Sequence, residues 1–279
     1  MGDSKTPLKA MVTAAVTNIV LDLIFVMVFH WGVEGAGIAT VLAQFCSGGI
    51  CCIQLKKYGV WKMSKEDWKY DFCVVKKLLG LGLPVAFQNI IIGFGGIAIQ
   101  YVINGFGFLY VAGFTATNKL YGLFELAAVS LGYATSSFVG QNLGAGEYQR
   151  IKDGVKISAQ LSVVIALAVG AVLLIFGHEI LGIFISPTEK QAEEVLKIAY
   201  NYLAVMGATL IILYLLHIYR SALQGMGDTV IPMFSGIAEM IMRISIAFFL
   251  PFVMGKEGIY FAETGAWPVS YTHLRAHET

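Results

Sequence analysis

Seven apolar runs, each long enough to cross a lipid bilayer, constrain this chain more than any other feature. An α-helix needs about 20 apolar residues to span the hydrocarbon core. The runs cover residues 8–29, 35–55, 78–103, 108–139, 157–176, 198–219 and 230–254, and an eighth begins near Gly258 and breaks off. Because lipid offers backbone groups no hydrogen-bond partners, spanning segments of this kind form helices. The pattern predicts an all-α polytopic membrane protein.

The composition agrees with that class and excludes others. Charged residues make up 13% of the chain and the formal net charge is +1, whereas about 25% of the residues of a soluble domain are charged. A balance so close to neutral gives no reason to expect nucleic acid as a partner. The first run is too long to be the core of a cleaved signal peptide. The four cysteines form no Cys-x-x-Cys motif, so we expect them to serve in helix packing.

Basic residues are divided unevenly between the two sets of loops that alternate along the spans. One set, at residues 1–7, 56–77, 142–156 and 220–229 with the adjoining helix ends, holds thirteen Lys and Arg residues, and the opposite set holds three. Cytoplasmic loops carry such an excess. The count predicts that the first set lies in the cytoplasm and that the protein spans the plasma membrane many times.

A short phrase occurs twice, near the two ends of the chain. Residues 1, 2, 3 and 7 (Met, Gly, Asp, Pro) recur 225 positions later, and residues 32, 34, 35 and 39 (Gly, Glu, Gly, Ala) recur 223 positions later. Each copy therefore reads as a Gly-Asp turn, a helix, a Gly-Glu-Gly turn and a returning helix. Internal duplication of helix units is common in transporters. The repeat predicts two related helical hairpins that run in the same direction.

Several motifs resemble one transporter family. The stretch "FVGQNLGAGEYQR" at Phe138, "NIVLD" at Asn18, "GIAT" at Gly37 and "GLPVAFQN" at Gly82 are similar to those of the multidrug and toxic compound extrusion (MATE) family of efflux antiporters. In that family a Gly-Gln-Asn-x-Gly-Ala turn follows the second helix of each bundle. Here the turn would be formed by Gly140, Gln141, Asn142, Gly144 and Ala145.

The resemblance implies a fold of twelve helices in two bundles of six, of which this chain holds part. Residues 1–55 would be helices five and six of the amino-terminal lobe, 56–77 a cytoplasmic connector, and 78–268 the carboxy-terminal lobe with its last helix cut short. Met1 would then be an internal methionine of a longer protein. Residues 269–279 lose the apolar character, and we expect them to be a non-family tail, an artefact foreign to the fold.

Asn18, Asp22 and Thr40 form the most informative polar group. Asn18 and Asp22 are four residues apart and share a helix face. Asp22 and Thr40 lie about 12 and 9 Å inward from the turn near residues 30–34, so the three side chains should meet. Their oxygens suit Na⁺, desolvation could instead make Asp22 a proton carrier, and a structural hydrogen-bond cluster is the third interpretation. The resemblance implies a cation or proton pocket, which in the family also includes an Asp of the first helix.

Six further polar residues are candidates for lining a transport cavity: Gln88, Asn89, Lys119, Glu125, Glu239 and Arg243. Charges inside spans cost roughly 2.5–3.5 kcal/mol each on insertion scales, so they need partners or water. Glu239 and Arg243 can pair along one helix, either to anchor packing or to line the cavity. Lys119 and Glu125 lie on different faces and need partners on other helices. Gln88 and Asn89 follow Pro84, and serve either in packing or as a polar wall.

The resemblance implies secondary active multidrug efflux, in which a gradient of H⁺ or Na⁺ drives antiport of amphipathic or cationic compounds by alternating access. The alternatives are a lipid-linked oligosaccharide flippase of the same superfamily and an inactive transporter fragment. No array of catalytic or metal-ligating residues is visible in the spans, so we expect neither an enzyme nor a metal or cofactor site. Expected partners are drug-like molecules and the bilayer, without nucleic acid, and the full-length protein is expected to be a monomer.

Overall fold

Helices make up every element of the described chain. The computed structural model describes residue 3 and residues 5–57, 69–185 and 191–276. In chain order the elements are α1 (Lys5–Asp22), the π-helix η1 (Leu23–Val28), α2 (Gly32–Lys57), α3 (Phe72–Phe106), α4 (Phe108–Gly144), α5 (Tyr148–Phe184), α6 (Ala192–Gly225), α7 (Val230–Met254), the 3₁₀-helix η2 (Gly255–Tyr260), α8 (Phe261–Thr264) and α9 (Ala266–Arg275). Within these residues, 7 helical stretches are long and apolar enough to cross a membrane. The predicted polytopic all-α class is therefore confirmed.

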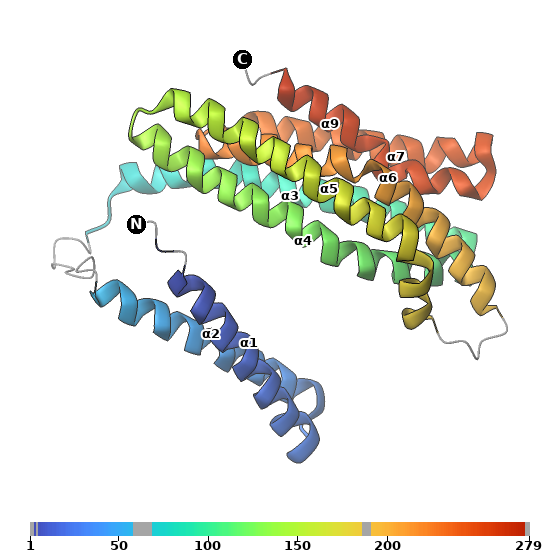
Figure 1. Cartoon of the computed structure of the whole chain (residues 1–279), viewed down its shortest axis with the longest axis horizontal. Helices are drawn as coiled ribbons and strands as arrows, with labels where there is room; N and C mark the ends of the chain where they lie inside the picture. Colours follow the sequence, from blue (N-terminus) through green and yellow to red (C-terminus); the bar gives the residue numbers. More distant parts are fainter. Residues whose placement is uncertain (1–2, 4, 58–68, 186–190, 277–279) are drawn as a thin grey trace. The chain divides into compact units, whose positions relative to one another are not determined.

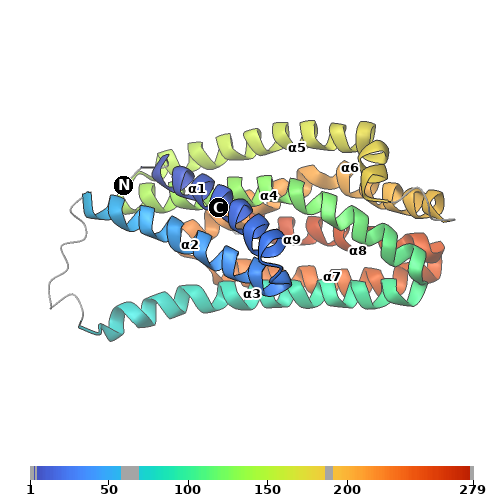
Figure 2. The same cartoon turned by 90° about the horizontal axis from the view of Figure 1, so that it is seen from below.

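The chain divides into two compact units, Met1–Phe72 and Cys73–Thr279. Unit 1 is a helical hairpin, in which α1 with η1 runs out and α2 returns along it (Figure 2). Alanines form the contact between the two helices, with Ala10, Ala14, Ala39 and Ala43 buried. Small residues let two helices approach closely in a membrane. The hairpin was expected from the first two apolar runs.

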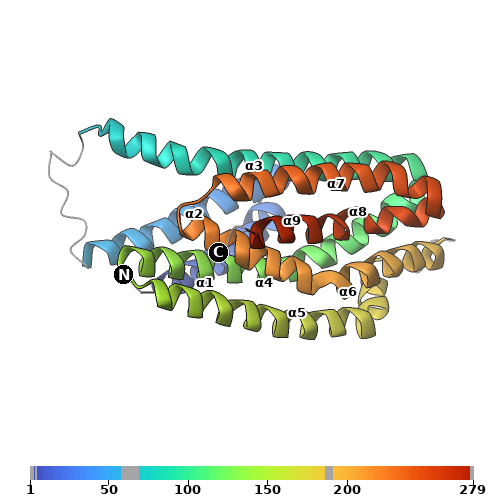
Figure 3. The ribbon, with the colours of Figure 1, turned by 90° about the horizontal axis from the view of Figure 1, so that it is seen from above.

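Unit 2 is a helical bundle around α6. Helices α4 and α5 pack on α6 and on each other, and α9 packs on α6 and α7 (Figure 1). Helix α3 lies beside α7 (Figure 3), and a Cβ on its Gly95 would stand 3.6 Å from the Met240 Cα. The turns that join α4 to α5 and α6 to α7 lie at the same end of the bundle. This agrees with the prediction that the loops at residues 142–156 and 220–229 lie on the same side of the membrane.

Aromatic residues fill the centre of unit 2. Phe114 of α4 stacks on Tyr202 of α6 with ring centroids 4.0 Å apart, and Tyr260 stacks on both. Trp267 of α9 is fully buried. Helix α6 buries apolar residues along most of its length, from Val195 to Leu223, as expected for a helix enclosed by others. Because neighbouring helices cover α6, the Arg220 side chain near its carboxyl end is largely shielded from solvent.

Residues 269–276 belong to the fold, whereas we expected the tail to be foreign to it. They continue α9 to Arg275, and Ser270 and Leu274 are fully buried. Trp267, Ser270 and Leu274 are spaced by three and four residues, so they share one helix face and pack together. Residues 277–279 lie outside the described part. The origin of residues 269–279 as a non-family tail stays a prediction.

Two predicted loops are shorter than expected. Helix α6 continues to Gly225, so Arg220 lies inside the helix and not in a loop. Helix α4 continues to Gly144, so most of the Gly-Gln-Asn-x-Gly-Ala motif forms its last turn. There the Asn142 Nδ2 donates a hydrogen bond to the Phe138 carbonyl at 2.8 Å. The charged residues at these positions fit in helices because the helices are longer than the apolar runs.

The connector predicted at residues 56–77 is described only at its ends. Lys56 and Lys57 end α2, and α3 begins at Phe72. Residues 58–68 lie outside the described part, and with them half of the predicted connector. Its role stays a prediction.

Both helices that follow the repeated Gly-Asp phrase are capped in the same way. The Asp3 Oδ1 accepts hydrogen bonds from the Lys5 and Thr6 amides, both at 3.1 Å. The Asp228 Oδ1 accepts them from the amides two and three residues later, at 3.1 and 3.2 Å. In each case the carboxylate satisfies amides that a helix start leaves unpaired. Gly2 lies outside the described part, but the capping aspartates support the repeat.

The second halves of the two repeats also agree. Gly32 and Gly255 both have positive φ, 58° and 67°, a conformation that glycine adopts without strain. Three residues later, a Cβ on Gly35 would come within 2.9 Å of the Trp31 side chain, and a Cβ on Gly258 within 2.8 Å of the Leu250 backbone. Both glycines therefore let the returning segment pass close to the chain that precedes it.

Candidate transport site

Asn18 and Thr40 meet in the hairpin of unit 1, as predicted. The Asn18 Nδ2 donates a hydrogen bond to the Thr40 Oγ1 at 3.3 Å. The hydroxyl in turn donates to the Ala36 carbonyl at 2.9 Å. Because the hydroxyl hydrogen points to this carbonyl of its own helix, the Thr40 oxygen can accept the hydrogen bond from Asn18.

Asp22 lies one helical turn beyond Asn18 on the same face of α1. Its Oδ1 atom is buried and has no hydrogen-bond partner among the described residues. A buried carboxylate oxygen without a donor is unfavourable, and the usual remedies are a proton or a bound cation. This atom is the clearest sign of a ligand in unit 1.

The helix changes form immediately after Asp22. The six residues Leu23–Val28 form a π-helix, and Asp22 is the residue that precedes it. Single π-turns inside α-helices are rare and occur often at functional sites. Asp22 therefore stands at the junction between α-helical and π-helical backbone, where the carbonyl groups leave the regular pattern.

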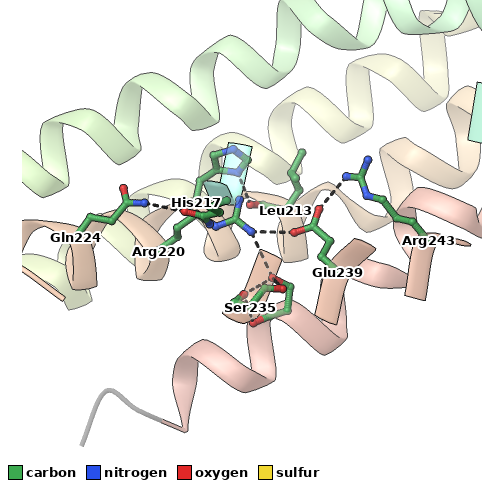
Figure 4. Close-up of polar contacts among 9 residues, drawn as sticks. Leu213, His217, Arg220, Gln224, Ser235, Glu239 and Arg243 are labelled. Atoms are coloured by element: carbon green, nitrogen blue, oxygen red, sulfur yellow. Dashed lines mark hydrogen bonds and ion pairs between the residues drawn. The ribbon is translucent and has the colours of Figure 1, made fainter. Parts of the chain in front are cut away.

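A second polar cluster lies inside unit 2 and centres on Glu239 of α7. Its Oε2 accepts a hydrogen bond from Arg220 Nη2 at 2.8 Å, and its Oε1 accepts one from Arg243 Nη2, also at 2.8 Å. Figure 4 shows the two guanidinium groups on opposite sides of the carboxylate. The Glu239 side chain is only 3% exposed. The carboxylate is thus held by two cations.

Arg243 reaches a second carboxylate on the segment that returns from α7. Its Nη1 is 3.6 Å from the Glu263 Oε1 of α8, and the two side chains are 11% and 18% exposed. The aliphatic part of Arg243 lies against α3, since a Cβ on Gly95 would come within 3.1 Å of its Cδ. Two arginines and two glutamates form one connected network, whose formal charges cancel.

Hydrogen bonds to serine hydroxyls extend the network to α9. Arg220 Nη2 also lies 3.3 Å from the Ser270 Oγ. The hydroxyl of Ser270 pairs with that of Ser235 on α7, at the position labelled in Figure 4. The buried hydroxyls of α7 and α9 therefore join these helices to α6 through one arginine.

Two amides pair beside the network. The Gln224 Nε2 of α6 donates to the Gln88 Oε1 of α3 at 3.1 Å. Gln88 is buried, and its Nε2 has no hydrogen-bond partner among the described residues. The pairing ties α3 to the carboxyl end of α6, close to the turn before α7.

The structure brings together only part of the predicted cavity-lining set. Glu239 and Arg243 pair along α7, and Gln88 is buried with a partner on α6. Asn89 and Lys119 are exposed on the surface of unit 2, and Glu125 is half-buried. A shared cavity for these six residues stays a prediction.

Sequence reasoning missed Arg220, Gln224 and Glu263. Arg220 was assigned to a loop because its charge ended an apolar run, although the helix continues for five residues to Gly225. Glu263 lies in the interrupted eighth run. The signal that could have found it is the repeat itself, since Glu263 stands 223 positions after Thr40.

The described part of the chain shows no cluster of residues suited to a metal site. Within the described ranges there is no group of three or more His, Cys, Asp and Glu side chains that could hold a metal ion. His217, on α6, places its Nδ1 3.0 Å from the Leu213 carbonyl and so is bound to its own helix. The side chains of the two polar clusters instead carry carboxylate, amide, hydroxyl and guanidinium groups.

Comparison with protein families gives one match that covers more than half of the chain. The family model described as MatE matches residues 84–249. Among curated proteins, "Probable multidrug resistance protein YpnP" of Bacillus subtilis is 32% identical over 210 residues, which cover 72% of this chain and 46% of that protein. "Probable multidrug resistance protein NorM" of Thermotoga maritima is 25% identical and is matched by 88% of this chain over 53% of its own length. This chain spans about half the length of these relatives.

Solved structures of similar fold are transporters. A mutant form of the Vibrio cholerae MATE transporter VcmN superposes with a TM-score of 0.87 at 19% identity, covering 99% of this chain and 64% of that one. A MOP superfamily transporter from Pyrococcus furiosus superposes with a TM-score of 0.85 at 21% identity, covering 96% and 61%. At such low identity the agreement concerns the fold.

Proposed function

Since this chain belongs to the MatE family, whose members are transporters and not enzymes, we propose that it acts in secondary active efflux, exporting amphipathic, often cationic compounds in exchange for a cation. The chain is a multi-pass protein of the plasma membrane. Two relatives bear names that refer to multidrug resistance, and we extend that class of drug-like substrate to this protein.

The observation that carries the proposal is the unpartnered carboxylate oxygen of Asp22. The atom is buried, one helical turn beyond Asn18, which binds Thr40, and an ionised side chain inside a spanning helix costs about 2.5–3.5 kcal/mol. Binding H⁺ or Na⁺ would remove that cost. The site therefore favours a state that carries a cation, which is the property that a coupling site needs.

Coupling follows if the pocket differs between two conformations. A ligand shifts a conformational equilibrium only by the difference between its affinities for the two states. In the hairpin of unit 1, the π-helix η1 lies directly beyond Asp22. We propose that its irregular backbone adjusts when the carboxylate is neutralised, and that this adjustment changes the balance between inward-open and outward-open forms.

The choice between H⁺ and Na⁺ depends on ligand number. The pocket offers a carboxylate, an amide oxygen and a hydroxyl oxygen from Asp22, Asn18 and Thr40. Oxygen ligands of this kind suit hard cations, while a proton needs only the carboxylate. Removing the Thr40 hydroxyl would therefore weaken sodium coupling more than proton coupling.

The flippase alternative receives less support from the network in unit 2. A lipid-linked oligosaccharide carries a polyphosphate group that needs free cationic side chains. Arg220 and Arg243, which lie inside the spans, are both paired with carboxylates. They have little positive charge left to offer to a phosphate.

The test is Asp22→Asn in the transporter that contains this chain, measured as resistance of the cells to toxic cationic dyes and as dye efflux. We expect loss of resistance at unchanged membrane expression, because the amide can neither bind a proton nor carry the charge that attracts Na⁺. Asp228→Asn is the matched control, since that aspartate caps α7 and asparagine also caps helices. Full resistance in the Asp22→Asn cells would remove this residue from the mechanism.

A further inference from the structure

The repeat places the polar residues of the two hairpins at corresponding positions. Asn18 of α1 and Arg243 of α7 are separated by 225 residues, the offset of the Gly-Asp phrases. Thr40 of α2 and Glu263 of α8 are separated by 223 residues, the offset of the Gly-Glu-Gly turns. Matching geometry supports both offsets. The two capping aspartates support the offset of 225, and the two positive-φ glycines support the offset of 223.

The corresponding residues also make corresponding contacts. In the first hairpin the outgoing helix reaches the returning one through the hydrogen bond from Asn18 to Thr40, at 3.3 Å. In the second, the outgoing helix reaches the returning segment through Arg243 and Glu263, at 3.6 Å. One architectural position thus holds a neutral pair in unit 1 and an ion pair in unit 2.

Each of the two neighbouring positions has a carboxylate in one hairpin and an alanine in the other. Ala14 corresponds to Glu239, and both are buried. Asp22 corresponds to Ala247, which is also buried. At these compared positions the first hairpin therefore has one carboxylate, with an unpartnered oxygen, and no cation. The second has two carboxylates, at positions 239 and 263, with a guanidinium between them.

We propose that the Arg243 guanidinium is a built-in cation: it fills, in the second hairpin, the place that the coupling cation fills in the first. The inference rests on the proposed function of the Asp22 pocket and adds that the second hairpin exchanges neither Na⁺ nor H⁺. Of the two described hairpins, the first then has an exchangeable cation site and the second does not.

Geometry and charge support this assignment. Arg243 binds Glu239 at 2.8 Å and Glu263 at 3.6 Å, and Arg220 binds the other oxygen of Glu239 at 2.8 Å. The two positive groups compensate the charges of the Glu239 and Glu263 carboxylates. Because the guanidinium group stays charged at all physiological pH values, the second hairpin cannot be emptied.

Removing the guanidinium should expose a cation site. In Arg243→Asn, which installs the residue type of the first repeat, Glu239 keeps Arg220 but Glu263 loses its cationic partner. The hairpin then carries one excess negative charge and an amide at the helix contact, much like the Asn18, Thr40 and Asp22 set. A monovalent cation of ionic size similar to Na⁺ is the expected ligand.

The experiment measures the thermal stability of the purified chain in lipid nanodiscs, titrated with NaCl against choline chloride at constant ionic strength and repeated over a pH series. A ligand that binds only the folded form raises the melting temperature in a saturable way. The parent should respond to Na⁺ or to H⁺, and Asp22→Asn should abolish that response. Asp22→Asn with Arg243→Asn should gain a saturable response to Na⁺, and adding Glu263→Gln should remove it again.

The outcomes separate the two proposals. A parent that responds to neither ion contradicts the proposed function of the Asp22 pocket alone. A double variant without a gained sodium response contradicts the built-in cation alone. A saturable sodium response that persists in the single Asp22→Asn variant also contradicts the built-in cation, because Arg243 should then leave no exchangeable site in the second hairpin. This outcome can be tested even if Arg243→Asn does not fold. Arg243→Lys in the Asp22→Asn background keeps the positive charge and should show no sodium response.

Discussion

Arg220 of α6 and Glu239 of α7 are joined by a hydrogen-bonded ion pair of 2.8 Å, with side chains only 13% and 3% exposed. The two residues lie on either side of the Gly-Asp turn that connects these helices. Since Glu239 also binds Arg243 and Arg220 also contacts Ser270, this pair connects α6, α7 and α9 into one polar core.

Replacing Glu239 with glutamine should destabilise unit 2 strongly. The amide leaves two buried guanidinium groups without their shared anion, and removal of one partner of a buried ion pair costs about 3–5 kcal/mol. The measurement is unfolding in a denaturing detergent, followed by circular dichroism. Glu257→Gln is the control, because that residue is exposed. A loss for Glu239→Gln no larger than for the control would show that the pair contributes little.

Replacing Arg220 and Glu239 together should cost less than replacing Glu239 alone. Buried ion pairs exchanged for apolar residues of similar volume are often neutral or stabilising. We expect Arg220→Met combined with Glu239→Met to recover stability relative to Glu239→Met, measured by the same unfolding assay. Additive losses in the double variant would indicate that the two side chains act independently.

Gly35→Ala should destabilise the hairpin of unit 1. The added methyl group would lie 2.9 Å from the Trp31 Cβ and 3.0 Å from the Phe25 Cβ, and overpacking of this kind costs about 1–3 kcal/mol. Gly37→Ala, on the same helix, meets nothing within 4 Å and should be neutral or slightly stabilising. Equal melting temperatures for both variants would contradict the close approach.

Asp228→Ala should lose the cap of α7. The Asp228 carboxylate binds the Val230 and Ile231 amides, and loss of a capping side chain costs about 0.5–2 kcal/mol. Asp228→Asn should retain most of the stability. Asp3→Ala should cost a similar amount in α1, because its bonds are the same. A large effect in one repeat and none in the other would count against their equivalence.

The orientation predicted from basic residues can be tested by cysteine labelling in a variant without its native cysteines. Ala145→Cys, in the turn after α4, should react with a membrane-impermeant maleimide only after the cells are opened. Glu257→Cys, in the turn after α7, should react in intact cells. The reverse pattern would invert the topology.

The locations of the spans could be predicted from sequence, because insertion into a bilayer depends on the apolar content of about 20 consecutive residues. The hairpin contact between Asn18 and Thr40 could also be predicted, since helical rise gives the depth of each residue. Spacing also predicted the Glu239–Arg243 pair. These contacts lie on one helix or between two consecutive helices.

The remainder required the tertiary structure. Arg220 was misassigned to a loop, and the burial of Ser270 and Leu274 in α9 was not foreseen, because apolar content alone does not show which helix face another helix will cover. The membrane class, the repeat and the positions of the charges follow from the order of the amino acids alone. Only the packing decided which charges meet, since Glu239 gains Arg220 from another helix, and the free energy of a buried charge depends on that partner more than on its own helix.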